Sequence, residues 1–389
     1  MPRREKFDVI VIGVGSMGSA ACWFLSGRGY KVLGIEQFGI SHERGSHTGQ
    51  SRIIRKAYFE HPDYVPLLKR AYENWKALES ETGSKIYHET GIVYFGPRDH
   101  ETMDGVRRAA RMHDIAVREF PAAESTLKFP QFRIPPHFQT LFEPESGFLT
   151  PDAAINAFVK HAIRRGSVIL TDERVSRWRN SGGEIEVVTP SGSFVADRLI
   201  ITAGSWTSKL LPELNSLLRV TRQLLAWVEP KKPEMFSMGR LPCWFVEDAE
   251  AGMLYGFPML DQSFGAPYGM KVALHVPGES WEPDIFTKDE WAKERDQLRH
   301  LLNKYLPDAG GKIVDMKSCL YTYSPDTNFI IDQVPGFDGR VTVACGFSGH
   351  GFKFSSVIGE ILADLAVDGK TDLPIDFLRL NRFNKSAAK

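Results

Sequence analysis

The strand that enters a glycine turn near the N-terminus constrains the fold of this chain more than any other feature. Residues 7–12 read Phe-Asp-Val-Ile-Val-Ile, and they lead directly into Gly13-Val-Gly-Ser-Met-Gly18, a helical segment over 19–29 and a second strand over 31–35. A Gly-x-Gly-x-x-Gly motif between a strand and a helix is typical of dinucleotide-binding folds. A structural glycine turn in an ordinary βαβ unit is the alternative.

The residues of this motif have separate predicted tasks. Gly13 would make the tight turn, Gly15 would let the backbone approach a pyrophosphate, and Gly18 would let the helix pack closely on the strand. Glu36, at the end of the second strand, is placed to hold a ribose hydroxyl. The motif therefore predicts a bound dinucleotide beside this turn.

A second glycine-rich loop lies near the other end of the chain. Residues 343–356 read Val-Ala-Cys-Gly-Phe-Ser-Gly-His-Gly-Phe-Lys-Phe-Ser-Ser, between an apolar strand and a helix predicted over 354–368. Gly346, Gly349 and Gly351 can adopt backbone conformations closed to other residues, and the helix would direct its N-terminal N–H groups toward the loop. We expect this loop to let the backbone approach a flat or anionic ligand.

Composition narrows the class of protein. The 389 residues are 42% apolar and 11% aromatic, which is enough for two packed domains. Lys plus Arg and Asp plus Glu each number 48, so a small ligand is expected rather than a nucleic acid or a membrane surface. The charged first residues and the lack of an apolar run of spanning length predict a cytoplasmic protein without a signal peptide. The four cysteines are widely spaced, which indicates reduced, mostly buried thiols and no metal site.

The order of the segments predicts two discontinuous domains. A Rossmann-like α/β domain is expected from residues 1–87, 151–220 and 326–389, and a substrate domain of the α+β class, with a mainly antiparallel sheet, from 88–150 and 221–325. Helices are expected over 64–82, 101–113, 151–165 and 288–305, and strands over 224–228, 253–257 and 270–275. The strand that ends in Ala203-Gly204 should bring a further backbone segment close to the dinucleotide; a plain strand-to-helix turn is the alternative.

Several motifs carry a family resemblance in combination. They are the first glycine turn, Glu36, the loop Gly45-Ser-His-Thr-Gly-Gln-Ser-Arg-Ile-Ile-Arg55, Ala203-Gly204, Cys319-Leu-Tyr-Thr322 and the loop over 346–356. With these motifs the chain resembles the monomeric sarcosine oxidase family, which also contains N-methyltryptophan oxidase and the sarcosine/pipecolate oxidases. The resemblance spans nearly the whole chain and implies an enzyme that uses FAD, rather than NAD, to oxidise secondary amino acids.

The resemblance implies a set of FAD-binding residues. They are Gly13, Gly15, Ser16, Met17, Gly18, Glu36, Gln37, Arg44, Ser46, Ser51, Arg52, Val175, Ala203, Gly204, Trp206, Cys319, Gly346, Phe347, Gly349, His350, Gly351 and Lys353. Cys319 matches the position at which the family attaches its flavin, as a thioether to the 8α carbon. We expect a partly exposed thiol beside the Lys317 cation, because such a thiol has a larger thiolate fraction; an inert core cysteine is the alternative.

The strand over 270–275 carries two candidate catalytic residues. Its alternation puts Lys271, Ala273 and His275 on one face. The resemblance assigns Lys271 to oxygen activation, where a cation favours the negative charge that builds up as electrons pass to oxygen, and it places His275 near the substrate amine. Tyr255, a third candidate, would present a hydroxyl and an aromatic wall to a small amine. The alternatives are a solvated lysine, a hydrogen-bonded structural histidine and a core tyrosine.

Two cations match the residues that hold the substrate carboxylate in the family. Arg55 would bind it through parallel hydrogen bonds, and Lys353 would add a point charge. For Arg55 a surface ion pair is the alternative. Arg52 matches a residue that lies under the flavin and supports its reactivity.

The implied reaction is the oxidation of a secondary amino acid, most simply sarcosine, by oxygen with release of hydrogen peroxide. A larger N-methyl amino acid, or a cyclic one such as pipecolate, is an alternative substrate, and residues 256–270 with Met259, Phe264 and Tyr268 are expected to line the pocket. An amine dehydrogenase with another electron acceptor and a flavoprotein without catalysis are further alternatives. The resemblance implies a monomer whose partners are a small amino acid and oxygen.

Overall fold

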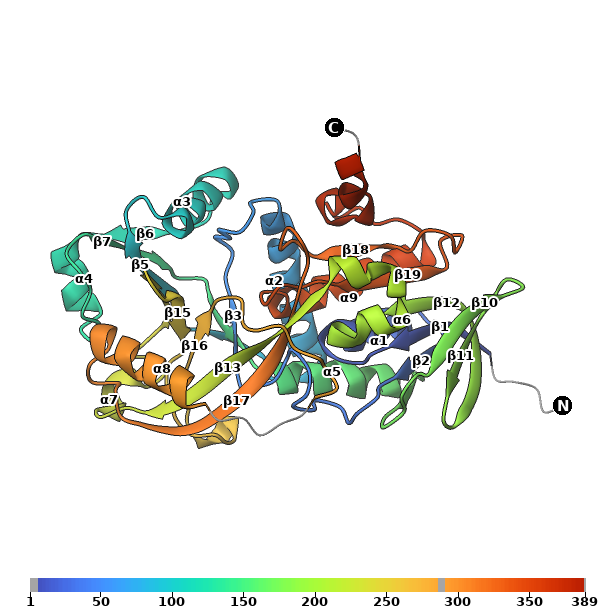
Figure 1. Ribbon diagram of the computed structural model, residues 1–389, viewed down its shortest axis with the longest axis horizontal. Coiled ribbons are helices and arrows are strands. Elements are labelled where there is room, and N and C mark those ends of the chain that lie inside the picture. The colour runs from blue at the N-terminus through green and yellow to red at the C-terminus, as the bar shows by residue number, and fades with distance from the viewer. Residues whose placement is uncertain (1–5, 286–290, 388–389) are drawn as a thin grey trace.

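Two large β-sheets lie side by side in the computed structural model of the chain, which describes residues 6–285 and 291–387 (Figure 1). The first sheet runs β10-β11-β12-β1-β2-β9, and β19 pairs with β12 and with β18 outside this path. Parallel pairing joins β12, β1, β2 and β9, so the strand that enters the first glycine turn is central. The strands are β1 (Lys6–Ile12), β2 (Val32–Ile35), β9 (Val168–Leu170), β10 (Arg177–Ser181), β11 (Glu184–Thr189), β12 (Gly192–Ile201), β18 (Ile330–Gln333) and β19 (Val341–Cys345).

The second sheet runs β17-β13-β16-β15-β14-β5-β7-β6, and it is antiparallel except between β14 and β5. Its strands are β5 (Ile92–Pro97), β6 (Arg118–Phe120), β7 (Phe138–Glu143), β13 (Arg219–Glu229), β14 (Cys243–Asp248), β15 (Gly252–Gly256), β16 (Met270–His275) and β17 (Lys312–Tyr323). Three short strands, β3 (Arg52–Ile54), β4 (Tyr87–Glu89) and β8 (Gly147–Leu149), form a further sheet. The predicted fold class is confirmed, and the assignment of residue ranges to two domains stays a prediction.

Most of the longer helices agree with the sequence patterns. They are α1 (Ser16–Gly27), α2 (Tyr64–Thr82), α3 (Glu101–His113), α4 (Ala122–Lys128), α5 (Pro151–Arg164), α6 (Thr207–Leu210), α7 (Pro233–Phe236), α8 (Ala292–Tyr305) and α9 (Ser355–Val367). The helices predicted over 64–82 and 101–113 are confirmed, whereas the short helices α4, α6 and α7 were not predicted. The first helix begins at Ser16 rather than at residue 19, because its first turn lies inside the glycine motif. Residues 288–290 of the helix predicted over 288–305 lie outside the described residues.

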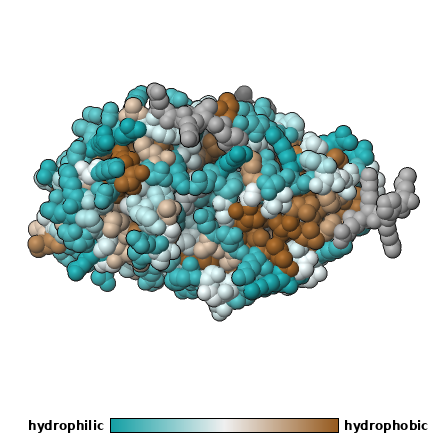
Figure 2. Space-filling model, turned by 90° about the horizontal axis from the view of Figure 1, so that it is seen from below, coloured by the Kyte–Doolittle hydropathy of each residue, from teal (hydrophilic) through white to brown (hydrophobic). Residues whose placement is uncertain are grey.

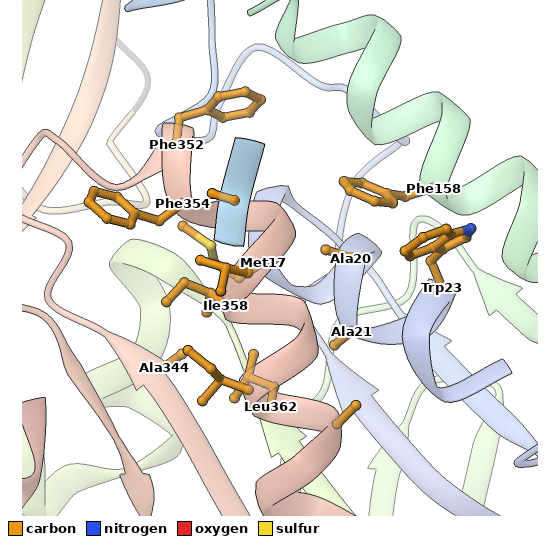
Figure 3. Packing of buried hydrophobic residues seen from close by; sticks show 14 of the residues in the cluster. Met17, Ala20, Ala21, Trp23, Phe158, Ala344, Phe352, Phe354, Ile358 and Leu362 are labelled. Carbon is orange, nitrogen blue, oxygen red and sulfur yellow. The ribbon is translucent and has the colours of Figure 1, made fainter. Parts of the chain in front are cut away.

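Segments near the two ends of the chain come together where α9 packs against α1 (Figure 3). A Cβ atom added at Gly359 would lie 2.5 Å from the Cβ of Ala20 and 2.8 Å from the backbone nitrogen of Ala21. The missing side chain therefore lets the two helices approach closely, and Met17 and Leu362 belong to the same buried cluster. This contact places the glycine loop that precedes α9 beside the glycine turn that precedes α1.

Hydrophilic residues cover most of the face shown in Figure 2. Hydrophobic residues on this face gather on the half of the molecule that carries the first sheet. Ile163 at the end of α5 and Val168 in the edge strand β9 are also exposed. Among the described helices, none combines the length and the apolar character needed to cross a membrane.

We expect Gly359→Ala to destabilise the protein, although alanine is favoured over glycine in a helix interior by about 1 kcal/mol. The added methyl group would meet backbone atoms of α1, which cannot rotate away, so overpacking of about 1–3 kcal/mol outweighs the helix preference. The free energy of unfolding in urea measures the effect. Gly27→Ala is the matched control, because its methyl group would meet only the end of the flexible Arg165 side chain. An unchanged free energy of unfolding for Gly359→Ala would contradict the close contact.

Candidate active site

Residues from both large sheets line one cavity of about 340 Å³. On the first sheet, Gly13, Glu36, Ala203 and Gly346 follow the carboxyl ends of β1, β2, β12 and β19. On the second sheet, Tyr255 contributes from β15. In α/β sheets, ligands bind at the carboxyl ends of the parallel strands. The position of this cavity therefore indicates a ligand-binding site.

The first glycine turn leaves room for a ligand at the N-terminus of α1. Gly13 has a φ of +88°, and a Cβ atom there would lie 2.5 Å from the carbonyl oxygen of Thr202, so only glycine fits. At Gly15 an added Cβ would have only the His47 side chain near it, at 3.8 Å. No side chain caps α1, and its first turn contains no acidic residue. The N–H groups at this helix end therefore favour an anion such as a pyrophosphate.

Two buried polar side chains complete this end of the cavity. The Glu36 carboxylate accepts hydrogen bonds from the backbone N–H groups of Val14 at 2.9 Å and Phe38 at 3.1 Å. His47 is 4% exposed, and its Nε2 has no hydrogen-bond partner within residues 6–285 and 291–387. Burial, helped by the neighbouring charges of His42 and Arg52, lowers the pKa of His47 to about 3, so the ring is neutral. The turn, the carboxylate and the unpartnered ring nitrogen together fit a bound dinucleotide.

Most of the predicted FAD-binding residues line the cavity. These are Gly13, Gly15, Ser16, Met17, Glu36, Gln37, Ser46, Arg52, Val175, Ala203, Gly204, Trp206, Gly346, Phe347, Gly349, His350, Gly351 and Lys353. Gly18, Arg44, Ser51 and Cys319 are not in its wall. An added Cβ at Gly18 would lie 2.6 Å from Oγ1 of Thr202, so this glycine serves the close helix packing predicted for it. Arg44 lies over the Phe38 ring, with its Cζ 4.7 Å from the ring centre.

Lys271 is buried and does not line the cavity, so the alternative of a solvated lysine is wrong. It is 2% exposed, and its Nζ donates a hydrogen bond to the carbonyl oxygen of Ser51 at 2.5 Å. The Nζ also lies 4.7 Å from the centre of the Phe257 ring. Arg52 is in the cavity wall and donates to the same Ser51 carbonyl at 2.9 Å. Burial, together with the Arg52 cation, lowers the pKa of Lys271 well below its ordinary value.

Cys319 is buried rather than partly exposed, so this expectation is wrong. It is 2% exposed, because the pairing of β17 with β13 encloses it in a cluster with Tyr321. The neighbouring Lys317 forms an ion pair with Glu43 instead. Burial raises the pKa of Cys319, and the cations of Arg52 and Lys271 oppose that rise. All four cysteines are buried and free, whereas the sequence predicted that they are mostly buried.

Arg55 and Lys353 lie near each other, over the ring of Tyr58. The Cζ of Arg55 is 4.4 Å from the ring centre, and the Nζ of Lys353 is 5.1 Å from it. Arg55 is 2% exposed, and its Nη2 donates to both carboxylate oxygens of Glu60 at 2.7 Å, so its ion pair is not on the surface. The Nζ of Lys353 donates to the carbonyl oxygen of His350 at 2.8 Å. Burial and the Arg55 charge lower the pKa of Lys353 to about 7.

His275 and Tyr255 form part of an aromatic wall with Tyr321. The ring centre of His275 lies 6.4 Å from that of Tyr255 and 6.0 Å from that of Tyr321. Burial lowers the pKa of His275 to about 4 and raises that of Tyr255, so both side chains are neutral near pH 7. Along the same strand Ala273 packs in the cluster that contains Cys319, which confirms the predicted alternation of β16.

The segment expected to set the size of the substrate lies mostly away from the cavity. Phe257 is in the wall, but Met259, Phe264 and Tyr268 are not, so the prediction for these three residues is wrong. The ring centre of Phe264 lies 5.0 Å from that of His88 in β4, and Tyr268 is 54% exposed. The chain after Phe257 folds against the small sheet and toward solvent instead.

Sequence reasoning missed several residues in the cavity wall, among them His47, Phe59, Glu60 and Phe245. The first three lie within or next to the loop that carries the family resemblance, so their closeness to Arg55 in the sequence was a usable signal. Phe245 lies on β14, and only the packing of β14 near the residues after β3 brings it to the cavity. No local pattern could have identified it.

Comparisons with known proteins agree on one family. A family model described as FAD dependent oxidoreductase matches residues 8–365. Monomeric sarcosine oxidase from Bacillus sp. (strain NS-129) is 38% identical over 394 residues, which cover 98% of this chain and 99% of that protein. N-methyl-L-tryptophan oxidase from Yersinia pestis (strain Pestoides F) is 33% identical over 379 residues, which cover 97% of this chain and 99% of that protein.

Solved structures share the fold at lower sequence identity. NikD, an unusual amino acid oxidase essential for nikkomycin biosynthesis, has a TM-score of 0.85 at 23% identity in its open form, with 96% of this chain and 97% of that chain covered. L-proline dehydrogenase from P. horikoshii has a TM-score of 0.83 at 21% identity, with 98% and 99% covered. Because the family model and the sequence relatives each span nearly the whole chain, the protein belongs to the FAD-dependent oxidoreductase family, alongside the monomeric sarcosine oxidases.

Proposed function

We propose that the protein is an FAD-dependent oxidase of a secondary amino acid, most simply sarcosine, which it converts with oxygen and water to glycine, formaldehyde and hydrogen peroxide. The observation that carries this proposal is the pair of buried cations, Arg55 and Lys353, in the same cavity as the dinucleotide turn. Buried cations favour an anionic ligand, and the carboxylate of an amino acid is one. The relatives named monomeric sarcosine oxidase and N-methyl-L-tryptophan oxidase support the same class of substrate.

The residues in the cavity would orient the substrate rather than supply the redox chemistry. Bound FAD would accept a hydride from the carbon beside the substrate nitrogen and pass the electrons to oxygen. Arg55 and Lys353 would hold the carboxylate and so fix the position of that carbon. Neutral His275 can accept a hydrogen bond from the amine N–H, and Tyr255 would present an aromatic wall beside it. The nearby cations disfavour a protonated amine, which keeps the nitrogen lone pair available for the reaction.

Two buried residues have proposed roles beside the cofactor. Lys271, with Arg52 next to it, would stabilise the negative charge that develops as oxygen is reduced. Cys319 would bind FAD covalently as a thioether at the 8α carbon. The Arg52 and Lys271 cations support this role, because they favour the thiolate that bond formation requires.

A larger N-methyl amino acid or a cyclic one is the second candidate substrate. Phe245, Met253 and Phe257 make one part of the cavity wall apolar, which suits a substrate with a hydrophobic side chain. An amine dehydrogenase with another electron acceptor is the alternative reaction. A cytoplasmic monomer is proposed for the protein on its family resemblance and composition.

The purified protein should release hydrogen peroxide with sarcosine or with another member of a panel that includes N-methyltryptophan, pipecolate and proline. Lys271→Met should slow reoxidation of the reduced protein by air about a hundredfold, because the loss of one preorganised electrostatic contact has an effect of that order. Reduction by substrate under nitrogen should change much less. Stopped-flow absorbance of the flavin measures both steps.

Lys317→Met is the matched control for Lys271→Met, because Lys317 pairs with Glu43 rather than with the residues of the cavity. If the substrate reduces the flavin but no hydrogen peroxide forms, the protein is an amine dehydrogenase rather than an oxidase. No flavin reduction by any member of the panel would reject the proposed class of substrate.

The yellow colour of the protein should stay in the pellet after precipitation with acid, and it should pass to the supernatant for Cys319→Ala. A thioether survives denaturation, whereas bound FAD without a covalent bond is released when the fold is lost. Cys22→Ala removes another buried thiol, in α1, and should leave the colour in the pellet. Colour released from the wild-type protein would exclude the covalent bond.

The affinity for carboxylates should fall as the pH rises through about 7, the pKa of Lys353. Lys353 is cationic below this pKa and neutral above it, so an anion binds best on the acid side, and the bound anion moves the midpoint upward. The Kd of methoxyacetate, a carboxylate without an oxidisable amine, should rise about tenfold between roughly pH 6 and pH 9. Lys353→Met should weaken binding and remove this pH dependence, and a flat profile for the wild-type protein would contradict the assignment.

A further inference from the structure

The Arg55 guanidinium lies between two aromatic rings. The rings of Tyr58 and Phe59 are stacked, with their centres 6.5 Å apart and their planes 14° apart. The Cζ of Arg55 lies 4.4 Å from the Tyr58 centre and 4.0 Å from the Phe59 centre. These three distances place Cζ between the two centres, to one side of the line that joins them. A third ring, that of Phe245, has its centre 5.8 Å from Cζ.

Separate parts of the fold hold the two stacked rings. Tyr58 is buried, and its hydroxyl and the Nδ1 of His350 form a hydrogen bond of 2.5 Å. His350 belongs to the glycine loop between β19 and α9. Phe59 lies against α3, where a Cβ atom added at Gly105 would be 2.7 Å from the Phe59 Cβ. The position of Arg55 therefore depends on the glycine loop through one ring and on α3 through the other.

One N–H donor of the Arg55 guanidinium is available to bind a ligand. Its Nη1 donates to the carbonyl oxygen of Ala57 at 3.2 Å, and its Nη2 donates to Glu60. Its Nε is buried and has no hydrogen-bond partner in the part of the chain that the structure describes. A buried donor without a partner is destabilising until a ligand accepts its hydrogen bond. The two rings flank Cζ, so we expect a ligand to approach Nε from the side that the rings leave free, where a carboxylate can accept its hydrogen bond as it does when it binds arginine.

We propose that Phe59 is a positioning residue that, with Tyr58, holds the Arg55 guanidinium so that its Nε faces the substrate carboxylate. The inference rests on the proposed role of Arg55 in carboxylate binding. A cation stacked on an aromatic face is held by the negative charge of that face. Tyr58 lies on one side of the Arg55 Cζ, and Phe59 lies on the other. Phe59 acts on the substrate through Arg55.

Two small ligands can distinguish a role of Phe59 in positioning Arg55 from a role in packing alone. Methoxyacetate has the shape of sarcosine with an ether oxygen in place of the amine, and it binds without turnover. Methoxyacetamide replaces the carboxylate by a neutral amide. Phe59→Ala should raise the Kd of methoxyacetate about tenfold and change the Kd of methoxyacetamide less than about twofold, since the lost interaction acts on the cation. Calorimetric titration of the FAD-loaded protein measures both constants.

Three further variants make the test specific to the aromatic face. Phe59→Tyr should keep the wild-type Kd for methoxyacetate, whereas Phe59→Leu, which fills the space without a π face, should resemble Phe59→Ala. If Phe59→Ala folds poorly, as its FAD content and thermal midpoint would reveal, the comparison of Phe59→Leu with Phe59→Tyr decides the question. Phe264→Ala removes a ring outside the cavity wall and is the control.

The proposal would be overturned if Phe59→Leu kept the wild-type Kd for methoxyacetate, or if Phe59→Ala weakened the binding of both ligands equally. It would also be overturned if methoxyacetate did not bind to the wild-type protein. Failure of the proposed function has a different signature. If methoxyacetate binding depends on Phe59 and on Arg55 while no N-methyl amino acid is oxidised, the positioning role stands and the oxidase is rejected. If oxidation proceeds and methoxyacetate binding does not depend on Phe59, the oxidase stands and the positioning role is rejected.

Discussion

The close contact between α1 and α9 at Gly359 decides where the site of this protein can form. Each helix follows a glycine-rich turn, one near the start of the chain and one near its end. The helices approach as they do because position 359 has no side chain to meet Ala20. With the helices in contact, both turns open on the same cavity, at the carboxyl ends of β1 and β19, the two strands that pair in parallel with β12. One backbone contact between distant segments therefore assembles the dinucleotide site.

The burial of three cationic side chains is the second constraint on the site. Arg55, Lys271 and Lys353 are all buried. Burial alone would raise the pKa of Glu60, but Arg55, supported by His350 and Lys353, lowers it to about 2, so the Arg55 ion pair stays charged. Burial and the neighbouring arginines lower the pKa values of Lys271 and Lys353, which favours their neutral forms. Ionisable groups whose pKa values are shifted by burial and by neighbouring charges are typical of functional sites.

Local properties made much of this fold predictable. The strand that precedes Gly13 and the helices α2 and α3 follow from apolar spacing and turn residues that lie within a few positions of each other. Most cavity residues inferred by resemblance belong to such motifs. The errors concern exposure, which is not a local property. Cys319 was expected to be partly exposed, but the strand paired beside it buries it. Tyr268 was expected in the pocket, but the loop that carries it turns to solvent.

The sequence by itself determined the strand, glycine turn and helix that build a dinucleotide cradle, because hydrogen bonding and backbone sterics act over a few residues. It also determined the types of side chain available to an amino acid carboxylate. Only the tertiary structure decided which of these side chains meet. Arg55 follows β3, Phe245 lies on β14 and His350 lies in the loop after β19, and they surround one space because sheet pairing and helix packing bring these segments together. Burial and the charge state that follows from it are properties of that assembly, so no segment carries them alone.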